Sequence, residues 1–312
     1  MKRTIALVLV LTLSLFCFAA CKKDKGNDEK TYSVAIATDS AVKNGKVTNT
    51  ALVLVIDADN KIAAARFECA EVTAALNEDG TIKEVATVDT KVEQGDSYGG
   101  GSAEKPAMPA GSWAKQTKAY EDAIVGKTAD EVANLDAALH AGCTMKNTVP
   151  TFKALVAKAF ASTTKVTFKT TEAITTGIAI DTSVKNSKGK AAVSSDIAGV
   201  VMAGGKVAAC MLDSVEQTFA VADGALVADA LAVSKNDQGD SYGGGSAEKP
   251  AMPAGSWAKQ AQAFANSAVG KTVAELANLE TVSDALKAAG CTMKNTTAGY
   301  KATIIAAAGY AR

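Results

Sequence analysis

The stretch "QGDSYGGGSAEKPAMPAGSWAKQ" at 94–116 recurs without a change at 238–260. The match continues downstream as "VGKTADEVANL" (125–135) against "VGKTVAELANL" (269–279). A solenoid needs three or more units to bury a continuous core, whereas this chain of 312 residues holds two copies. Its length also suits two domains of ~100–200 residues each. The repeat therefore predicts two tandem globular domains.

Each copy begins with sequence that is typical of strands. "VTNTALVLVIDADNKIAAARFE" (47–68) corresponds to "AVSSDIAGVVMAGGKVAACMLD" (192–213). Apolar, β-branched runs broken by turns rich in Asp, Asn or Gly favour antiparallel strands. We place the two domains at 31–162 and 163–312. Because no Pro/Gly-rich linker separates them, we expect them to sit close together.

The rest of each copy changes to a helical period. In the first copy, Trp113, Tyr120 and Ile124 follow one another at spacings of seven and four, which places them on one face of a helix that Gly126 can end. Together with the strands, this pattern predicts an α+β fold. Each copy would be a small, mainly antiparallel sheet followed by about three short helices.

Two further helices are expected in the first copy. Thr128 and Glu131 form the pattern of a capping box, and we expect that helix to run to Gly142. The next helix has Pro150 near its first turn, where proline is tolerated. Its apolar face would be formed by Phe152, Leu155, Val156 and Ala159.

The first 30 residues resemble a bacterial lipoprotein signal. Lys2 and Arg3 precede the apolar run "TIALVLVLTLSLFCFAA", and Cys21 is followed by "KKDKGNDEK". We predict a signal peptide at 1–20, lipidation of Cys21, and a polar tether at 21–30. The protein would then be extracytoplasmic and lipid-anchored to the cell membrane. The alternative is ordinary cleavage that leaves a free Cys21.

Composition narrows the function further. The chain has 33 basic and 33 acidic residues, so it has no basic field for a nucleic-acid backbone, and we expect no nucleic-acid partner. No pair of cysteines has CxxC spacing, so we expect no metal site. We interpret the cysteines outside the signal segment as buried free thiols: Cys69, Cys143, Cys210 and Cys291.

The octapeptide "AGCTMKNT" occurs at 141–148 and again at 289–296. Its glycine, Gly142 or Gly290, would end one helix, and its last threonine would cap the next. The central threonine would then lie ahead of helix N–H groups that favour phosphate. The alternative is that these threonines only form caps and turns. The residues concerned are Thr144 and Thr292, Lys146 and Lys294, and the caps Thr148 and Thr296.

This layout resembles the FMN-binding domain found in the C subunit of sodium-pumping quinone reductases and in flavin-bearing lipoproteins of extracellular electron transfer. In that family a Ser/Thr-Gly-Ala-Thr segment precedes a C-terminal helix, and a dedicated flavin transferase attaches FMN to the last threonine through a phosphoester. "GCTMKNTVPTFKALVAKAF" and "GCTMKNTTAGYKATIIAAA" are similar to that stretch, and "GDSYGGG…GSWAKQ…VGKT" is similar to the lipoprotein branch. The resemblance implies covalent FMN on Thr144 and Thr292.

The sequence departs from the family pattern at three places. Alanine replaces the hydroxyl residue before the glycine, and Cys143 or Cys291 replaces the alanine after it. The candidate acids, Asp136 and Asp284, lie eight residues before the threonine, which is further than the pattern has them. If the transferase requires these features, FMN could bind without a covalent bond, or not at all.

Aromatic residues in the identical block could form the wall of a flavin site. An isoalloxazine ring needs a flat apolar surface, and aromatic stacking suits it. The candidates are Tyr98 and Trp113 in the first copy, and Tyr242 and Trp257 in the second. The alternative is that the tryptophans anchor a helix to the sheet. His140 has no equivalent in the second copy, where Ala288 stands, so we do not interpret it as a catalytic base.

These patterns favour a membrane-anchored electron carrier rather than an enzyme. Two flavins on adjoining domains would let electrons step along one chain. The expected partners are the membrane, a flavin transferase, and a quinone- or NADH-linked membrane reductase as electron donor. The alternative is a surface binding or structural lipoprotein that keeps the fold without a flavin.

Overall fold

The computed structural model describes residues 28–101, 108–136, 143–245, 252–293 and 296–312. Several predictions therefore lie outside the described residues: the signal peptide at 1–20, Cys21 and most of the tether at 21–30, His140, Gly142 and Lys294.

The strands form two antiparallel four-stranded sheets, ordered β3-β2-β1-β4 and β5-β6-β7-β8. Tight turns join the long strands, as the Asp-, Asn- and Gly-rich segments predicted. The first sheet consists of β1 (Lys30–Lys43), β2 (Lys46–Asp57), β3 (Ile62–Thr73) and β4 (Val166–Thr170). The second consists of β5 (Ile174–Ser187), β6 (Lys190–Ala203), β7 (Lys206–Ala222) and β8 (Ala225–Ala228).

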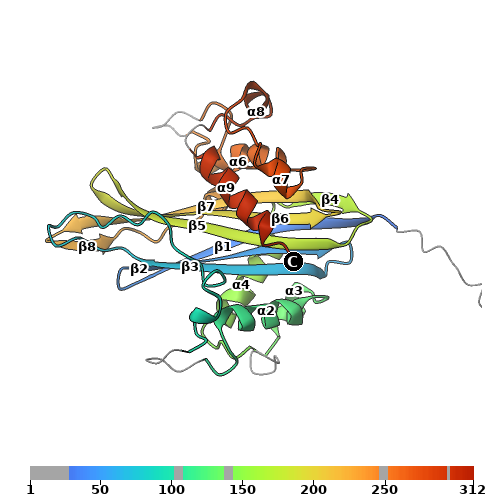
Figure 1. Cartoon of the computed structure of the whole chain (residues 1–312), viewed down its shortest axis with the longest axis horizontal. Coiled ribbons are helices and arrows are strands. Elements are labelled where there is room, and N and C mark those ends of the chain that lie inside the picture. Colours follow the sequence, from blue (N-terminus) through green and yellow to red (C-terminus); the bar gives the residue numbers. More distant parts are fainter. Residues whose placement is uncertain (1–27, 102–107, 137–142, 246–251, 294–295) are drawn as a thin grey trace, which may run out of the picture.

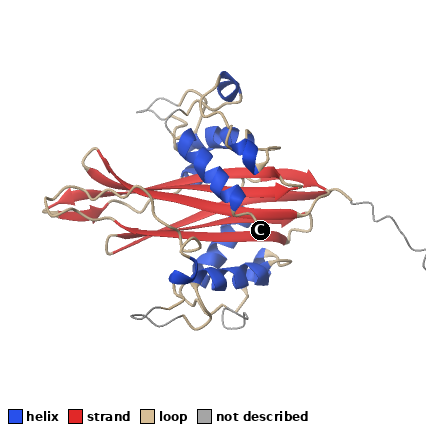
Figure 2. Cartoon of the chain, viewed as in Figure 1, coloured by secondary structure: helices blue, strands red, loops and turns tan. Residues whose placement is uncertain are grey.

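Helices cover the outer face of each sheet, so the molecule has four layers, with the two sheets inside (Figures 1 and 2). The fold class is α+β, as predicted. The first sheet is covered by α2 (Trp113–Ile124), α3 (Ala129–Ala133) and α4 (Val149–Ala161), and η1 (Gly95–Ser97) precedes them. The second is covered by α6 (Trp257–Asn266), α7 (Val273–Leu276), α8 (Asp284–Ala288) and α9 (Thr297–Gly309), preceded by α5 (Lys235–Gln238) and η3 (Gly239–Ser241).

Strand β4 connects the two halves of the chain. It lies within 163–312, yet Val166–Thr170 pairs with Lys30–Val34 of β1 in the first sheet. The chain thus adds the first strand after residue 162 to the edge of the sheet that precedes it. Among the described residues, no helix is long and apolar enough to cross a bilayer.

Burial on both faces explains why β2 is almost continuously apolar. Leu52 and Leu54 pack against the helices, whereas Val53 and Val55 face the other sheet. Strands that are covered on both faces lose the alternation that a half-exposed strand shows. On the helical side, the predicted faces are confirmed: Trp113, Tyr120, Ile124, Phe152, Leu155, Val156 and Ala159 are buried.

The predicted capping box is confirmed, but the length of its helix was wrong. The Thr128 side chain accepts a hydrogen bond from the N–H of Glu131, and the Glu131 carboxylate accepts one from the N–H of Thr128. The helix then ends at Ala133: Asn134 is its C-cap and donates its side-chain amide to the Asp130 carbonyl, and the Leu135 N–H donates to the Val132 carbonyl in a tighter turn. A local asparagine cap thus stops the helix well before Gly142.

The two sheets pack face to face through an apolar interface that contains a close backbone approach. A Cβ added at Gly199 would lie 2.8 Å from Val53 Cγ2, which is too short for a carbon–carbon contact. Polar pairs also cross the interface: the Asn49 side-chain amide donates to Ser195 Oγ at 2.8 Å. Glycine at 199 therefore allows β2 and β6 to reach this separation.

We expect Gly199→Ala to destabilise the protein by about 1–3 kcal/mol, because the added methyl group overpacks the interface between the sheets. Chemical denaturation measures this loss. Gly309→Ala is the control, since nothing lies within 4 Å of its added Cβ, and we expect it to be neutral or slightly stabilising. Val53→Ala should restore stability in the Gly199→Ala background. Equal effects of the two glycine substitutions would contradict this account.

Each sheet also carries one buried acid near the interface. Glu68 of β3 accepts hydrogen bonds from the backbone N–H groups of Cys69 (2.9 Å) and Val92 (3.2 Å). Asp213 of β7 accepts them from Ser214 (2.8 Å) and Asn236 (3.1 Å) in the same way. Burial raises the pKa of both carboxyl groups, and that of Glu68 to about 8.

The raised pKa of Glu68 predicts a pH dependence of stability. The folded protein holds this proton up to about pH 8, whereas the unfolded chain loses it near 4.5. The contribution of Glu68 to stability is therefore present below pH 4.5 and is lost as the pH rises through about 8. We expect Glu68→Gln, which keeps an acceptor for Cys69, to flatten this fall in denaturation curves across that range. An unchanged pH slope would refute the assignment.

Candidate functional site

A buried glutamine holds the central threonine of each octapeptide. Gln116 of α2 accepts two hydrogen bonds at Oε1, from the backbone N–H of Thr144 at 2.8 Å and from its hydroxyl at 3.0 Å. In the second copy, Gln260 of α6 accepts the same two bonds from Thr292, at 2.9 and 2.8 Å. Both glutamines are 0 % exposed. We call each of these pairs a glutamine–threonine clamp.

The orientation of each glutamine is fixed from its other end. The Nε2 group of Gln116 donates to the Gly111 carbonyl at 2.8 Å, and that of Gln260 donates to the Gly255 carbonyl at 2.9 Å. Because the amide nitrogen is used in this way, the oxygen must face the threonine. Each clamp therefore ties the octapeptide to the identical 23-residue block.

The central threonine lies between two buried neighbours. Cys143 and Met145 are buried, whereas Thr144 between them is exposed. In the second copy the flanking cysteine and methionine are also buried, and Thr292 is half-buried. The apolar side chains anchor the segment, and the threonine between them donates its hydroxyl hydrogen bond to the clamp glutamine. The predicted free, buried thiols are confirmed for Cys69, Cys143, Cys210 and Cys291.

The octapeptide leads into a helix as predicted, but its last threonine does not act as a side-chain cap. Thr148 and Thr296 occupy the N-cap positions of α4 and α9, and neither side chain makes a capping hydrogen bond. The turn is closed by the backbone instead: the Lys146 N–H donates to the Thr144 carbonyl at 2.9 Å. Lys146, two residues after Thr144, is exposed.

The tryptophans lie in the core, which agrees with the alternative that they anchor a helix to the sheet. Trp113 is 2 % exposed and meets Phe152 edge to face at 6.0 Å, and Trp257 is 3 % exposed and meets Tyr300 in the same way at 5.9 Å. A flavin ring could stack on either indole only after displacing a neighbouring side chain. The buried tryptophans therefore do not form an open wall.

The two tyrosines differ in their surroundings. The Tyr98 hydroxyl donates to Glu71 at 2.9 Å, and Lys91 pairs with the same carboxylate at 2.9 Å and lies over the Tyr98 ring at 4.8 Å. Tyr242 is 39 % exposed, with Lys235 over its ring at 5.2 Å. The second copy therefore presents the more accessible aromatic face.

The candidate acids do not converge on the threonines. Asp136 is exposed beyond the end of α3. Asp284 begins α8, its side chain is 97 % exposed, and it pairs with Lys287 at 2.8 Å. Gly290, by contrast, is needed for the local turn, because its φ of +95° lies in the left-handed region. Among the described residues, no group of three or more His, Cys, Asp or Glu side chains could hold a metal ion.

The second copy also contains a cleft of about 460 Å³. It lies among α6, α7 and α8 and reaches Ala289, three residues before Thr292. Its size is within the range of clefts that bind cofactors, about 300–1,000 Å³. The lining includes Ala263, Asn266, Leu279, Ser283 and Leu286.

Comparison of the chain with protein-family models, with curated proteins and with solved structures gave no match.

Sequence reasoning did not assign a role to the clamp glutamines. The sequence did contain a sign that these glutamines are buried, because each lies three residues after a tryptophan on an apolar helix face and therefore shares that face. A polar residue on an apolar helix face needs a partner. Because Gln116 and Thr144 are far apart in the sequence, the pattern does not indicate that Thr144 is the partner of Gln116.

We expect Gln260→Leu to destabilise the protein by about 1–3 kcal/mol, because it leaves the N–H and hydroxyl of Thr292 without their acceptor. Hydrogen exchange should accelerate around 291–293 and stay unchanged around Thr144, which the intact Gln116 still holds. Gln116→Leu is the matched variant and should give the reverse pattern. Exchange that rises equally in both octapeptides would show that the clamps do not act locally.

Proposed function

We propose that the chain is a duplicated FMN-carrying protein, with the cofactor esterified to Thr144 and Thr292. The observation that carries the proposal is the pair of glutamine–threonine clamps, which hold the central threonine of each octapeptide in the same way in both copies. The same residues bear the flavin in the family that the sequence resembles. FMN, when attached, would supply one- and two-electron transfer.

The proposal includes two copies of one module, each a sheet followed by short helices. The contacts that close the module recur in both halves. The Ile62 N–H donates to the Lys127 carbonyl at 2.9 Å, and the Val207 N–H donates to the Lys271 carbonyl at 2.8 Å. The capping box of Thr128 and Glu131 recurs at Thr272 and Glu275. These contacts support the division into equivalent copies.

The clamp suits a threonine that becomes modified. Attachment forms a bond between Oγ and phosphorus as an activated donor, such as a flavin dinucleotide, loses its nucleotide, and the hydroxyl proton leaves. The hydroxyl can then no longer donate to the glutamine, but the N–H of the same threonine still can. The segment would therefore keep its position after modification. The cleft among α6, α7 and α8 would give a ring system space in the second copy, and Lys146, two residues after Thr144, would be a countercharge for the phosphate of the first site.

The layer order bears on the path of the electrons. The helices that carry the two clamps lie on opposite sides of the double sheet (Figure 1). Packed sheets alone are ~10 Å apart, and the clamps lie beyond them on either side. We therefore propose that each site exchanges electrons with its own partner, rather than passing them to the other site as the sequence suggested.

The membrane part of the proposal rests on the sequence alone. A lipid on Cys21 would hold the protein on the outer side of the cell membrane. The tether at 21–30 would let it reach a quinone- or NADH-linked reductase. A flavin transferase is the remaining partner that the proposal requires.

We expect the mature protein, coexpressed with a flavin transferase, to gain two FMN groups in intact-mass spectra. Thr144→Ala and Thr292→Ala should each remove one group, and the double variant should remove both. Thr148→Ala and Thr296→Ala are the controls, since they change neighbouring threonines without touching the clamp. Peptide mapping then locates the groups.

An unmodified protein with no bound chromophore would refute the proposal in favour of the alternative, a binding or structural lipoprotein. Two observations favour that alternative. Alanine precedes the glycine in both octapeptides, and Cys143 and Cys291 are buried next to the threonines.

A further inference from the structure

After each long helix, α4 and α9, the chain runs along the boundary between the two sheets. The segment after α9 pairs with β5 of the second sheet, where Thr176 and Arg312 exchange backbone hydrogen bonds at 3.3 and 3.4 Å, and it also contacts Arg66 of the first sheet. The segment after α4 likewise runs to β4 and lies against the second half of the chain. Each of these two segments lines one side of a cleft between the two halves: residues after α9 line the first cleft, and residues after α4 line the second.

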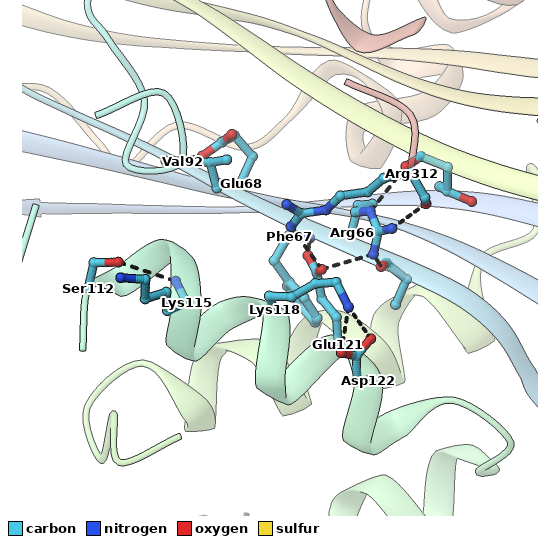
Figure 3. A network of polar contacts seen from close by, with 12 residues as sticks. Arg66, Phe67, Glu68, Val92, Ser112, Lys115, Lys118, Glu121, Asp122 and Arg312 are labelled. Atoms are coloured by element: carbon cyan, nitrogen blue, oxygen red, sulfur yellow. Dashed lines mark hydrogen bonds and ion pairs between the residues drawn. The ribbon is translucent and has the colours of Figure 1, made fainter. Parts of the chain in front are cut away.

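In the first of these places, large polar side chains fill the space (Figure 3). Arg66 pairs with Glu121 at 2.9 Å, donates from Nε to the Thr176 carbonyl at 3.1 Å, and also donates to the carbonyl of Arg312. The Tyr310 hydroxyl donates to Glu93 at 2.9 Å at the edge of the same region. A cleft of only about 120 Å³ remains.

In the second place, smaller residues occupy the equivalent positions. Met211 is the equivalent of Arg66. Arg66 comes four residues after Ile62 and Met211 four residues after Val207, the two strand residues that donate to the equivalent lysine carbonyls. Ala265 stands where Glu121 does, since each is five residues after a clamp glutamine. Thr164 occupies the position of Arg312, counted from the N-cap threonines of α4 and α9.

These replacements leave a cleft of about 440 Å³, next to a smaller one of about 280 Å³. Thr164 and Asn236 line both, so the two spaces adjoin. The two copies thus have equivalent spaces at this place in the fold. Side chains fill the space beside Arg66, whereas the space beside Met211 is open. The open cleft lies between β4, β7 and α6, away from the clamp of Thr292.

The lining of the open cleft is mainly apolar, with hydrogen-bonding groups and paired charges. Met211, Val166 and Ala258 supply apolar surface, and Gln262 and Ser256 supply an amide and a hydroxyl. The charged groups already have partners. They are Lys259 with Asp240 at 2.8 Å, Lys165 with the Phe160 carbonyl at 2.6 Å, and Lys158 with Asp237.

We propose that this cleft binds a small, flat, uncharged aromatic molecule that carries a hydroxyl or carbonyl oxygen. The equivalent space in the other copy holds flat groups, the guanidinium groups of Arg66 and Arg312 and the ring of Tyr310. Because Ala265 replaces Glu121, the buried carboxylate that pairs with Arg66 has no counterpart, and the Asp240 carboxylate of the lining is already paired with Lys259. An apolar lining with few polar groups selects a neutral ligand with one or two hydrogen-bonding atoms.

Titration of the mature full-length chain with 2-naphthol, followed by calorimetry, tests this site. We expect saturable binding of one molecule per chain. Ala258→Phe fills the cleft and should weaken binding at least ~10-fold. Ala114→Phe, the same change at the matching position of the identical block, should leave binding unchanged. No saturable binding, or equal loss in both variants, would overturn the proposal.

A second variant introduces the side chains that fill the space in the first copy, Arg66 and Glu121, at the equivalent positions of the second copy. Met211→Arg combined with Ala265→Glu should abolish binding by rebuilding the arginine–glutamate pair. Circular dichroism and thermal unfolding establish that this double variant is folded. Undiminished binding by the folded double variant would place the ligand elsewhere and refute the assignment. Neither experiment depends on flavin attachment, so failure here is distinguishable from failure of the FMN proposal.

Discussion

The structure depends on the burial of two apolar sheet faces against each other. Helices cover only the outer face of each sheet, so the inner faces, with Val53 and Ile197 among their buried residues, need the partner sheet to exclude water. The close approach of Gly199 to Val53 sets the separation of the sheets. Because the halves share this interface, neither is a self-contained domain in the energetic sense. The two clamps are therefore held on opposite sides of one rigid double sheet.

Within each copy, a few polar contacts position the candidate site. The clamp glutamine is buried and satisfied at both ends, by a glycine carbonyl and by a threonine. The position of the octapeptide is thus set by the helix that carries the glutamine and not by the sheet. The threonine is the clamp residue that reaches the surface, exposed in the first copy and half-buried in the second. An attached group would add bulk at the surface without disturbing the core beneath it.

Much of the local structure could be predicted from the sequence, because it depends on neighbours along the chain. The strands, the helix face of Trp113 and Tyr120, and the capping box at Thr128 are of this kind. The end of α3 was wrong because Asn134 caps the helix locally, against the apolar period. The clamp, the burial of both sheet faces and the pairing of β4 depend on contacts between distant segments. Periodicity in one sequence carries no information on such contacts.

Strand β4 has one more consequence. It follows the boundary at 162 in sequence but belongs to the earlier sheet in space, where it pairs with Lys30–Val34. The two halves are thus interlaced as well as stacked. A polypeptide cut between α4 and β4 would yield a first fragment that lacks the edge strand of its sheet and a second fragment that carries this strand without the rest of that sheet. Such fragments would remain associated after cleavage, and the intact chain must complete its first sheet after its second half has begun to emerge from the ribosome.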